Sequence, residues 1–174
     1  MQRLAVAADA PAVAELMRSS VLDLFPAYYD ETQVASAAVH IAALDVALID
    51  DGTYYLHEVG GEVVACGGWS LRNKLFNGTD AGADSRLLDP ASEPARIRAM
   101  FVRRDWTRRG LGRAILASSV GAARSAGFRS LALMATLPGV PLYKALGFTE
   151  VERVPLTMPD GVVLPGVAME RGVD

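Results

Sequence analysis

Apolar positions along the chain recur at two spacings, and the change from one to the other predicts the order of the secondary structure. Spacings of three and four residues, typical of helices, occur in residues 10–20, 30–43, 110–126 and 140–146. Runs rich in β-branched and aromatic residues predict strands over residues 2–7, 53–59, 62–71, 96–102, 130–135, 149–154 and 162–169. The predicted order is β-α-α-β-β-β-α-β-α-β-β, an α/β fold with a mixed sheet covered by helices.

Turn residues support these boundaries. Gly60-Gly61 predicts a two-residue hairpin, and Pro159-Asp-Gly161 predicts the turn before the last strand. Gly127 and Gly147 each precede a phenylalanine, the ending expected of a helix C-cap. Residues 73–95 lack periodicity and are rich in Gly, Asp, Ser and Pro, so we expect a long loop there.

Length and composition indicate one ordinary globular domain over residues 1–174, with 51% hydrophobic and 21% charged residues. The single cysteine, Cys66, excludes an internal disulfide or a CxxC site, and we expect it to be a small core side chain. Asp45 and Asp50 interrupt the longest Ala-rich stretch, so no membrane span is expected. The first residues do not form a secretory signal, and a cytoplasmic protein is expected.

Charge is distributed unevenly, although the net charge is only −3. Residues 1–62 carry ten acidic side chains against two arginines, which suggests a cationic ligand near that part. Residues 96–113 hold seven arginines against Asp105, which suggests an anionic ligand.

The chemistry-bearing segment is residues 100–116, where a strand is followed by a basic loop and a helix that begins at Gly110 and Gly112. The first amides of a helix have no intrahelical partner, and the helix dipole favours negative charge there. Glycine lets phosphate oxygens approach those amides closely. The pattern therefore predicts a phosphate or pyrophosphate site.

Other phosphate-binding classes are excluded by single residues. Ile115 stands where a dinucleotide-binding GxGxxG motif needs its third glycine, and Arg113-Ala114 replaces the Lys-Ser/Thr of a P-loop. A pI near 5.4 argues against nucleic-acid binding.

Two segments resemble the signatures of the GNAT superfamily of N-acetyltransferases. Thr107-Arg-Arg-Gly-Leu-Gly112 is similar to the (Gln/Arg)-x-x-Gly-x-(Gly/Ala) acetyl-CoA signature, with Thr107 departing from its first position. Pro141-Leu-Tyr-Lys-Ala-Leu-Gly-Phe148 is similar to the later Tyr-x-x-x-Gly-Phe segment. The order of elements also matches that fold, and the resemblance is firmest over residues 96–150.

The resemblance implies an acetyl-CoA-dependent N-acetyltransferase without a metal, in which a neutral amine attacks the thioester directly. It places acetyl-CoA where the strands of residues 96–102 and 130–135 separate, and it makes Tyr143 the general acid that protonates the leaving thiolate. The expected contacts to acetyl-CoA are the backbone of Phe101 and Val102 and the loop residues Arg108, Arg109, Gly110, Leu111, Gly112 and Arg113.

The general base is left open by the sequence. Many relatives place a glutamate on the strand where this chain has Arg96 and Arg98. Glu93 is the nearest carboxylate before that strand, Glu58 and His57 are rivals, and a water-mediated route is an equal alternative.

The acceptor is expected to be a small-molecule or peptide amine, with no nucleic-acid or membrane partner. Its contacts are expected at Tyr28, Tyr29, Asp30 and Glu31, and the acidic balance of residues 1–62 suggests a cationic acceptor. A homodimer is the assembly that general frequencies favour. A rival hypothesis is a non-catalytic module that senses acyl-CoA or binds a partner, and another is transfer of a longer acyl chain.

Overall fold

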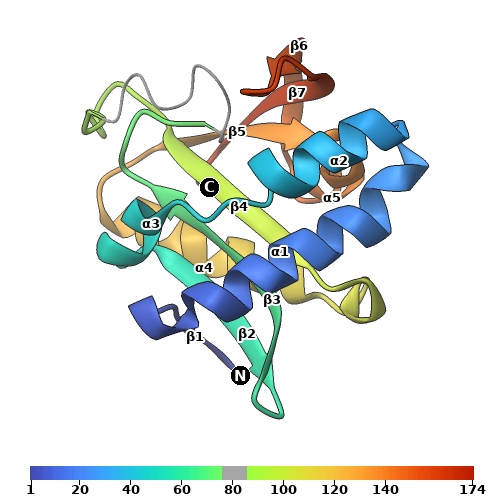
Figure 1. Cartoon of the computed structure of the whole chain (residues 1–174). Coiled ribbons are helices and arrows are strands. Elements are labelled where there is room, and N and C mark those ends of the chain that lie inside the picture. Colours follow the sequence, from blue (N-terminus) through green and yellow to red (C-terminus); the bar gives the residue numbers. More distant parts are fainter. Residues whose placement is uncertain (76–85) are drawn as a thin grey trace.

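A seven-stranded mixed sheet forms the centre of the protein in the computed structural model, which describes residues 1–75 and 86–174 (Figure 1). The strands lie in the order β1-β2-β3-β4-β5-β7-β6. Their bounds are β1 Gln2–Leu4, β2 Tyr54–Val59, β3 Glu62–Ser70, β4 Ala95–Val102, β5 Ser130–Thr136, β6 Thr149–Thr157 and β7 Val163–Gly172. Strands β4 and β5 are parallel, and the other neighbouring pairs are antiparallel. The predicted mixed sheet is confirmed.

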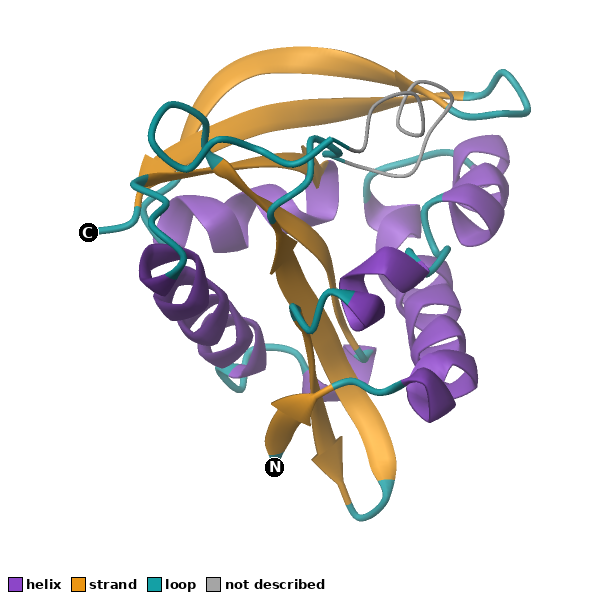
Figure 2. Ribbon diagram, turned by 90° about the vertical axis from the view of Figure 1, so that its left-hand side faces the viewer, coloured by secondary structure: helices purple, strands orange, loops and turns teal. Residues whose placement is uncertain are grey.

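Helices cover both faces of this sheet (Figure 2). Helices α1 (Ala10–Leu24), α2 (Glu31–His40) and α3 (Val46–Asp50) lie on one face, and α4 (Leu111–Ser125) and α5 (Val140–Ala145) lie on the other. The predicted order holds except for α3, whose five residues are too few to show a helical period. Asp45 caps α3 by accepting a hydrogen bond from the amide of Ala47.

Several boundaries differ from the predicted ones for local reasons. Strand β6 continues to Thr157 through Pro155, which an edge strand tolerates because no neighbour needs that missing N–H. The end of α2 at His40 falls three residues short of the prediction. The predicted loop over residues 73–95 is a loop where it is described, with one bridge between Arg72 and Leu87, and residues 76–85 lie outside the described part.

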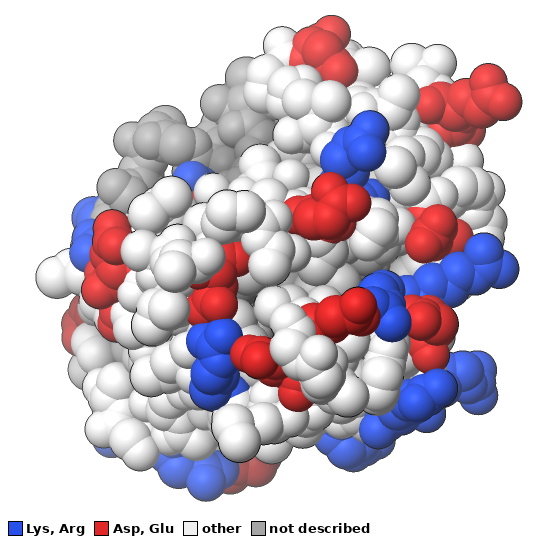
Figure 3. All heavy atoms as spheres, turned by 60° about the horizontal axis from the view of Figure 1, so that its bottom comes forward, with Lys and Arg blue, Asp and Glu red and all other residues white. Residues whose placement is uncertain are grey.

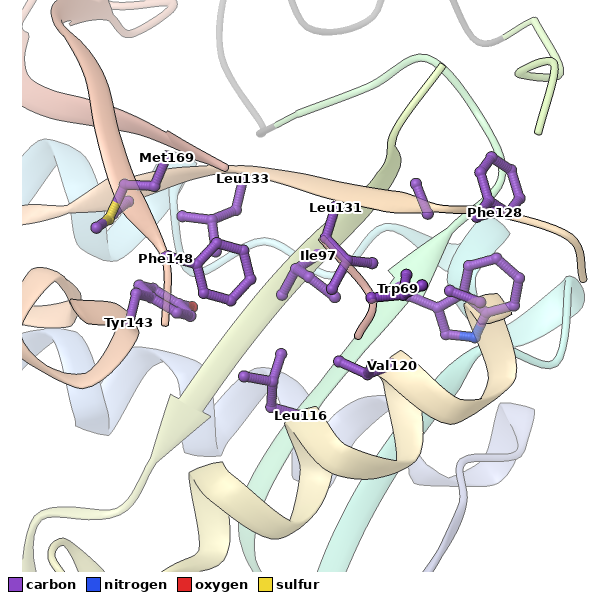
Figure 4. Packing of buried hydrophobic residues seen from close by; sticks show 14 of the residues in the cluster. Trp69, Ile97, Leu116, Val120, Phe128, Leu131, Leu133, Tyr143, Phe148 and Met169 are labelled. Atoms are coloured by element: carbon purple, nitrogen blue, oxygen red, sulfur yellow. The ribbon is translucent and has the colours of Figure 1, made fainter. Parts of the chain in front are cut away.

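Two layers of core pack on the faces of the sheet. Under α4 and α5, Trp69 packs edge-on against Phe128 with ring centroids 6.0 Å apart, near Ile97, Leu116 and other apolar side chains (Figure 4). On the other face, Met17 of α1 packs with Tyr54 and Cys66. Cys66 is 1% exposed, which confirms it as a core side chain.

The parallel pair β4–β5 separates soon after it begins. Its register consists of Ala95 opposite Leu131 and Arg96 opposite Ala132, and the two strands then diverge (Figures 1 and 4). The remainder of β4 therefore has no strand beside it on that side. This opening positions the site.

Candidate active site

A cleft of about 870 Å³ occupies the opening between β4 and β5. One end is lined by the loop before α4 and the first turn of that helix, and the other by the end of α1, Tyr28 and Ile41. Residues 97–102 of β4 form one wall, and residues 134–136 of β5 with α5 form the opposite wall. A long ligand can therefore lie along β4 and reach both ends.

The first end carries the geometry of an anion site. Gly110 caps α4 in the left-handed region, at φ +81°, a conformation that glycine adopts without strain. The first intrahelical bond is donated by the amide of Ala114 to the carbonyl of Gly110, so the amides of residues 111–113 precede the helical ladder. A Cβ on Gly112 would lie 3.2 Å from Cδ2 of Leu142, so a larger residue would narrow the cleft.

The seven arginines of residues 96–113 separate into different roles. Arg108 and Arg113 are exposed and line the anion end of the cleft. Arg109 lies over the ring of Trp106, 4.5 Å from its centroid, and does not line the cleft. Arg103 forms ion pairs with Asp105 and Glu62. Two of the three arginines predicted at the anion site thus line the cleft, and Arg109 does not.

Thr107, the departure from the family signature, lies inside this loop. Its hydroxyl donates a hydrogen bond to the carbonyl of Arg104 at 2.8 Å, and the residue lines the cleft. The following residue, Arg108, has φ +62°, a left-handed conformation that costs energy outside glycine. The Thr107 hydroxyl therefore stabilises the turn of the loop at Arg104. A Gln or Arg at this position has a longer side chain.

A bulge in β4 shapes the middle of the cleft. Cys66 faces Phe101 and Gly68 faces Arg98, so Gly67 alone stands opposite two residues of β4, Ala99 and Met100. A Cβ on Gly67 would lie 2.6 Å from Cγ of Met100, so only glycine lets the bulge pack this closely. The register shift leaves residues 99 and 100 without one-to-one partners on β3.

The backbone of Val102 points toward the open side of β4. The amide of the next residue, Arg103, donates a hydrogen bond to the carbonyl of Val64 on β3. Along an antiparallel strand, successive residues direct their backbone groups alternately toward one neighbouring strand and away from it. The carbonyl of Val102 instead accepts a hydrogen bond from the hydroxyl of Ser20 on α1, at 3.0 Å. By the same alternation, the backbone of Phe101 points toward β3, although both residues line the cleft.

Tyr143 of α5 lies in the wall of the cleft at 9% exposure. Its ring packs edge-on against Phe148, with centroids 5.7 Å apart (Figure 4). The ring also lies beside Gly139. Burial raises the pKa of its phenol above the ordinary value, so the hydroxyl stays protonated at neutral pH. The predicted general acid thus lines the cleft in its protonated form.

The three base candidates lie away from the cleft. Glu93 binds the guanidinium of Arg86 and accepts from the amide of Asp89, and these contacts hold the pKa of Glu93 at about 2. Glu58 pairs with Arg3 at 2.9 Å, and His57 lies beside the amino terminus. None of them lines the cleft, so the structure does not support a base among them.

Of the four residues expected at the acceptor, Tyr28 lines the cleft. Tyr29 is buried, and its hydroxyl donates to the carbonyl of Pro165 and accepts from the amide of Leu137, which makes it structural. Asp30 caps α2 through the amide of Gln33. Glu31 is exposed in the first turn of α2, outside the cleft.

The acidic side chains of residues 1–62 do not gather at the cleft. Asp9 and Glu58 pair with Arg3, Asp51 pairs with Arg72, and Glu62 pairs with Arg103. Over the face in Figure 3 acidic and basic side chains are interspersed. The cleft gives the expectation of a cationic acceptor no support, because none of these acidic side chains lines it.

Sequence reasoning missed Arg98 as a cleft residue. Its side chain is 2% exposed, lines the cleft, and lies 3.3 Å from the carboxylate of Asp45. A charged side chain inside the predicted strand of residues 96–102 could have indicated a functional role for Arg98. Its ion-pair partner Asp45 is 53 residues away in sequence, so no local pattern reveals the pair.

The described residues contain neither a metal-binding cluster nor a membrane-spanning helix. No cluster of three or more His, Cys, Asp or Glu side chains is arranged to hold a metal ion in residues 1–75 and 86–174. Within the same residues, no helix has both the length and the apolarity needed to cross a membrane.

The fold and this cleft define an acyltransferase-like site, and comparison with known proteins assigns the family. The model of the acetyltransferase (GNAT) family matches residues 14–148. The chain therefore belongs to the GNAT family of acetyltransferases. No curated protein matches the sequence significantly.

Solved structures share the fold at low identity. A GCN5-related N-acetyltransferase from Rhodopseudomonas palustris is 19% identical, with a TM-score of 0.75 over 99% of this chain and 94% of that one. The PaiA N-acetyltransferase of Thermoplasma acidophilum, solved with coenzyme A, is 11% identical, with a TM-score of 0.70 over 99% and 98%. The acetyltransferase YncA of Salmonella typhimurium, solved with acetyl-CoA, is 20% identical, with a TM-score of 0.64 over 100% and 94%.

Proposed function

We propose that the protein is an N-acetyltransferase that moves an acetyl group from acetyl-CoA to the amine of a small molecule or peptide. The observation that carries this proposal is the cleft between β4 and β5, which joins the amides at the start of α4 to Tyr143. Family membership and the coenzyme A complexes of two structural neighbours support it.

The cleft residues suit the parts of acetyl-CoA. The amides of residues 111–113, with Arg108 and Arg113, would hold the diphosphate, because helix amides and guanidinium groups both favour phosphate oxygens. The open backbone of Val102 would hydrogen-bond the pantetheine arm. A backbone amide of β4 beside the register shift at Ala99 and Met100 would stabilise the oxyanion of the tetrahedral intermediate.

In the proposed reaction the neutral amine attacks the thioester carbonyl, and the carbon–sulfur bond then breaks. Tyr143 would donate its proton to the leaving thiolate. The unperturbed phenol has a pKa near ~10 and the thiol one near ~8.5, so the transfer is modestly uphill before local effects. Burial raises the pKa of Tyr143, which keeps it in the donor form throughout an ordinary assay range but makes proton transfer to the thiolate more uphill.

The experiment is release of free coenzyme A, measured as thiol, with acetyl-CoA and a panel of amines. We expect turnover in the wild type and a loss of about 100-fold in kcat in Tyr143→Phe, because general acid catalysis contributes on the order of 10²–10⁴-fold. Tyr55→Phe, on β2 and outside the cleft, is the matched control. Binding of acetyl-CoA without release with any amine would favour a sensing module, and an unchanged kcat in Tyr143→Phe would remove that residue from the mechanism.

A further inference from the structure

The end of the cleft opposite the anion site has apolar walls. Leu24 and Phe25 come from the end of α1 and its following turn, Ile41 follows α2, and Leu156 belongs to β6. The titratable side chains that line the cleft in the described part of the chain are Arg98, Arg108, Arg113, Tyr28 and Tyr143. Among those residues the cleft thus contains no carboxylate and no imidazole.

Arg98 of β4 also lines the cleft, and its charge is paired. Its guanidinium lies 3.3 Å from a carboxylate oxygen of Asp45, which Lys74 also approaches at 3.3 Å. Asp45 does not line the cleft and instead lines a smaller cavity of about 210 Å³, which Arg98 also lines. Asp45 therefore neutralises Arg98 from outside the cleft and does not itself line it.

Two features disfavour a protonated amine at this end. Its apolar walls withdraw the hydration that an ammonium group needs, and no carboxylate among the described lining residues offers a counter-charge. A base that could take the proton from a bound ammonium group is not among the lining residues described. An amine that has already lost its proton in water avoids both costs.

Resting on the proposed function, we infer that the acceptor is an apolar amine that binds in its neutral form, so that the acceptor's own pKa governs the rate. Amines of low pKa, such as the α-amine of an apolar amino acid amide or peptide, are then favoured over alkylamines. In the reaction the N–C bond forms and the C–S bond breaks. The proton of the resulting ammonium goes to water, and the thiolate takes the proton of Tyr143, which solvent then replaces.

The test is kcat/KM for the acceptor between pH 6 and 10.5 with two apolar amines of similar size. Leucinamide carries an α-amine with a pKa near ~7.8, and 3-methylbutylamine an alkylamine with a pKa near ~10.4. We expect kcat/KM to rise tenfold per pH unit up to each acceptor's own pKa. The preference for leucinamide should be on the order of 100-fold at pH 7 and below about 10-fold at pH 10, following the neutral fractions.

A plateau from neutral pH upward for both amines, with one shared pKa, would reveal a base on the protein and overturn the inference while leaving acetyl transfer intact. A better rate with hexanoyl-CoA than with acetyl-CoA would assign the apolar walls to the acyl chain and also overturn it. Failure to release coenzyme A with any amine would overturn the proposed function, and this inference with it.

A charge variant gives a second, independent readout. Tyr28→Glu places a carboxylate at the cleft, on a side chain that is 48% exposed, so folding should tolerate the change. It should raise kcat/KM for 1,5-diaminopentane relative to 3-methylbutylamine at least fivefold at pH 8. Val39→Glu, on α2 and 65% exposed outside the cleft, is the matched control and should leave that ratio unchanged. Equal ratios in the two variants would contradict the inference.

Discussion

The buried hydroxyl of Tyr54 on β2 donates a hydrogen bond to the carbonyl of Ala99 in the β4 bulge, at 2.6 Å. Tyr54 is fully buried, and Ala99 has the left-handed φ of +50°, which is uncommon for alanine. A core side chain two strands away thus stabilises the strained backbone that shapes the middle of the cleft.

Tyr54→Phe should therefore weaken both stability and activity. Removal of the hydroxyl leaves a buried carbonyl without its partner, which costs about 1–3 kcal/mol. We expect a lower free energy of unfolding in urea and at least a tenfold loss of kcat/KM for acetyl-CoA. Tyr55→Phe on the opposite face of β2 is the control, since its side chain packs on the other core layer. If the two variants lose activity equally, the bulge does not depend on Tyr54.

Thr107→Gln should tighten coenzyme A binding. The threonine hydroxyl is engaged inside the loop with Arg104, whereas a glutamine side chain is long enough to reach the diphosphate. One added hydrogen bond contributes about 1 kcal/mol, or roughly fivefold in dissociation constant. Calorimetric titration measures the change, and Thr107→Val is the control for loss of the hydroxyl. A larger dissociation constant for coenzyme A in Thr107→Gln would contradict this prediction. It would show that the threonine hydroxyl is needed to hold the loop in its binding conformation.

Glu93→Gln should alter acid stability and leave turnover at pH 8 within about twofold. Pairing with Arg86 holds the pKa of Glu93 at about 2, below the ordinary value of 4.5. The pair therefore stabilises the folded state above pH 4.5, and this contribution is lost as the pH falls toward 2. Urea unfolding between pH 2 and 5 should show a shallower pH dependence in Glu93→Gln than in the wild type. A hundredfold loss of kcat at pH 8 would instead restore Glu93 as a base.

Cys66 should be inert to thiol reagents in the folded protein. Burial raises its pKa to about 12, so almost no thiolate forms at pH 8, and the side chain is inaccessible. We expect an aromatic disulfide reagent to modify native protein only at the rate of opening and to modify the urea-unfolded chain at once. Rapid labelling of the native protein would place Cys66 at the surface.

The sequence predicted those helices and strands that a hydrophobic period or a turn residue marks. It did not predict features that depend on contacts between residues far apart in the chain. The Gly60-Gly61 hairpin and the glycine at the start of α4 were readable because local backbone geometry requires those residues. The five-residue helix α3 and the partner of Arg98 were not, since no local pattern encodes either. The tyrosine pair 28–29 shows the same limit, because one lines the cleft and its neighbour is fixed by Pro165 and Leu137.

The most direct test of the account is the calorimetric dissociation constant of coenzyme A compared with that of pantetheine, which lacks the nucleotide diphosphate. If the amides at the start of α4 hold the diphosphate with Arg108 and Arg113, coenzyme A should bind at least 100-fold more tightly in the wild type. The difference should fall below about tenfold in the Arg108→Ala, Arg113→Ala double variant. Equal binding of the two ligands by the wild type would contradict a diphosphate site at that helix.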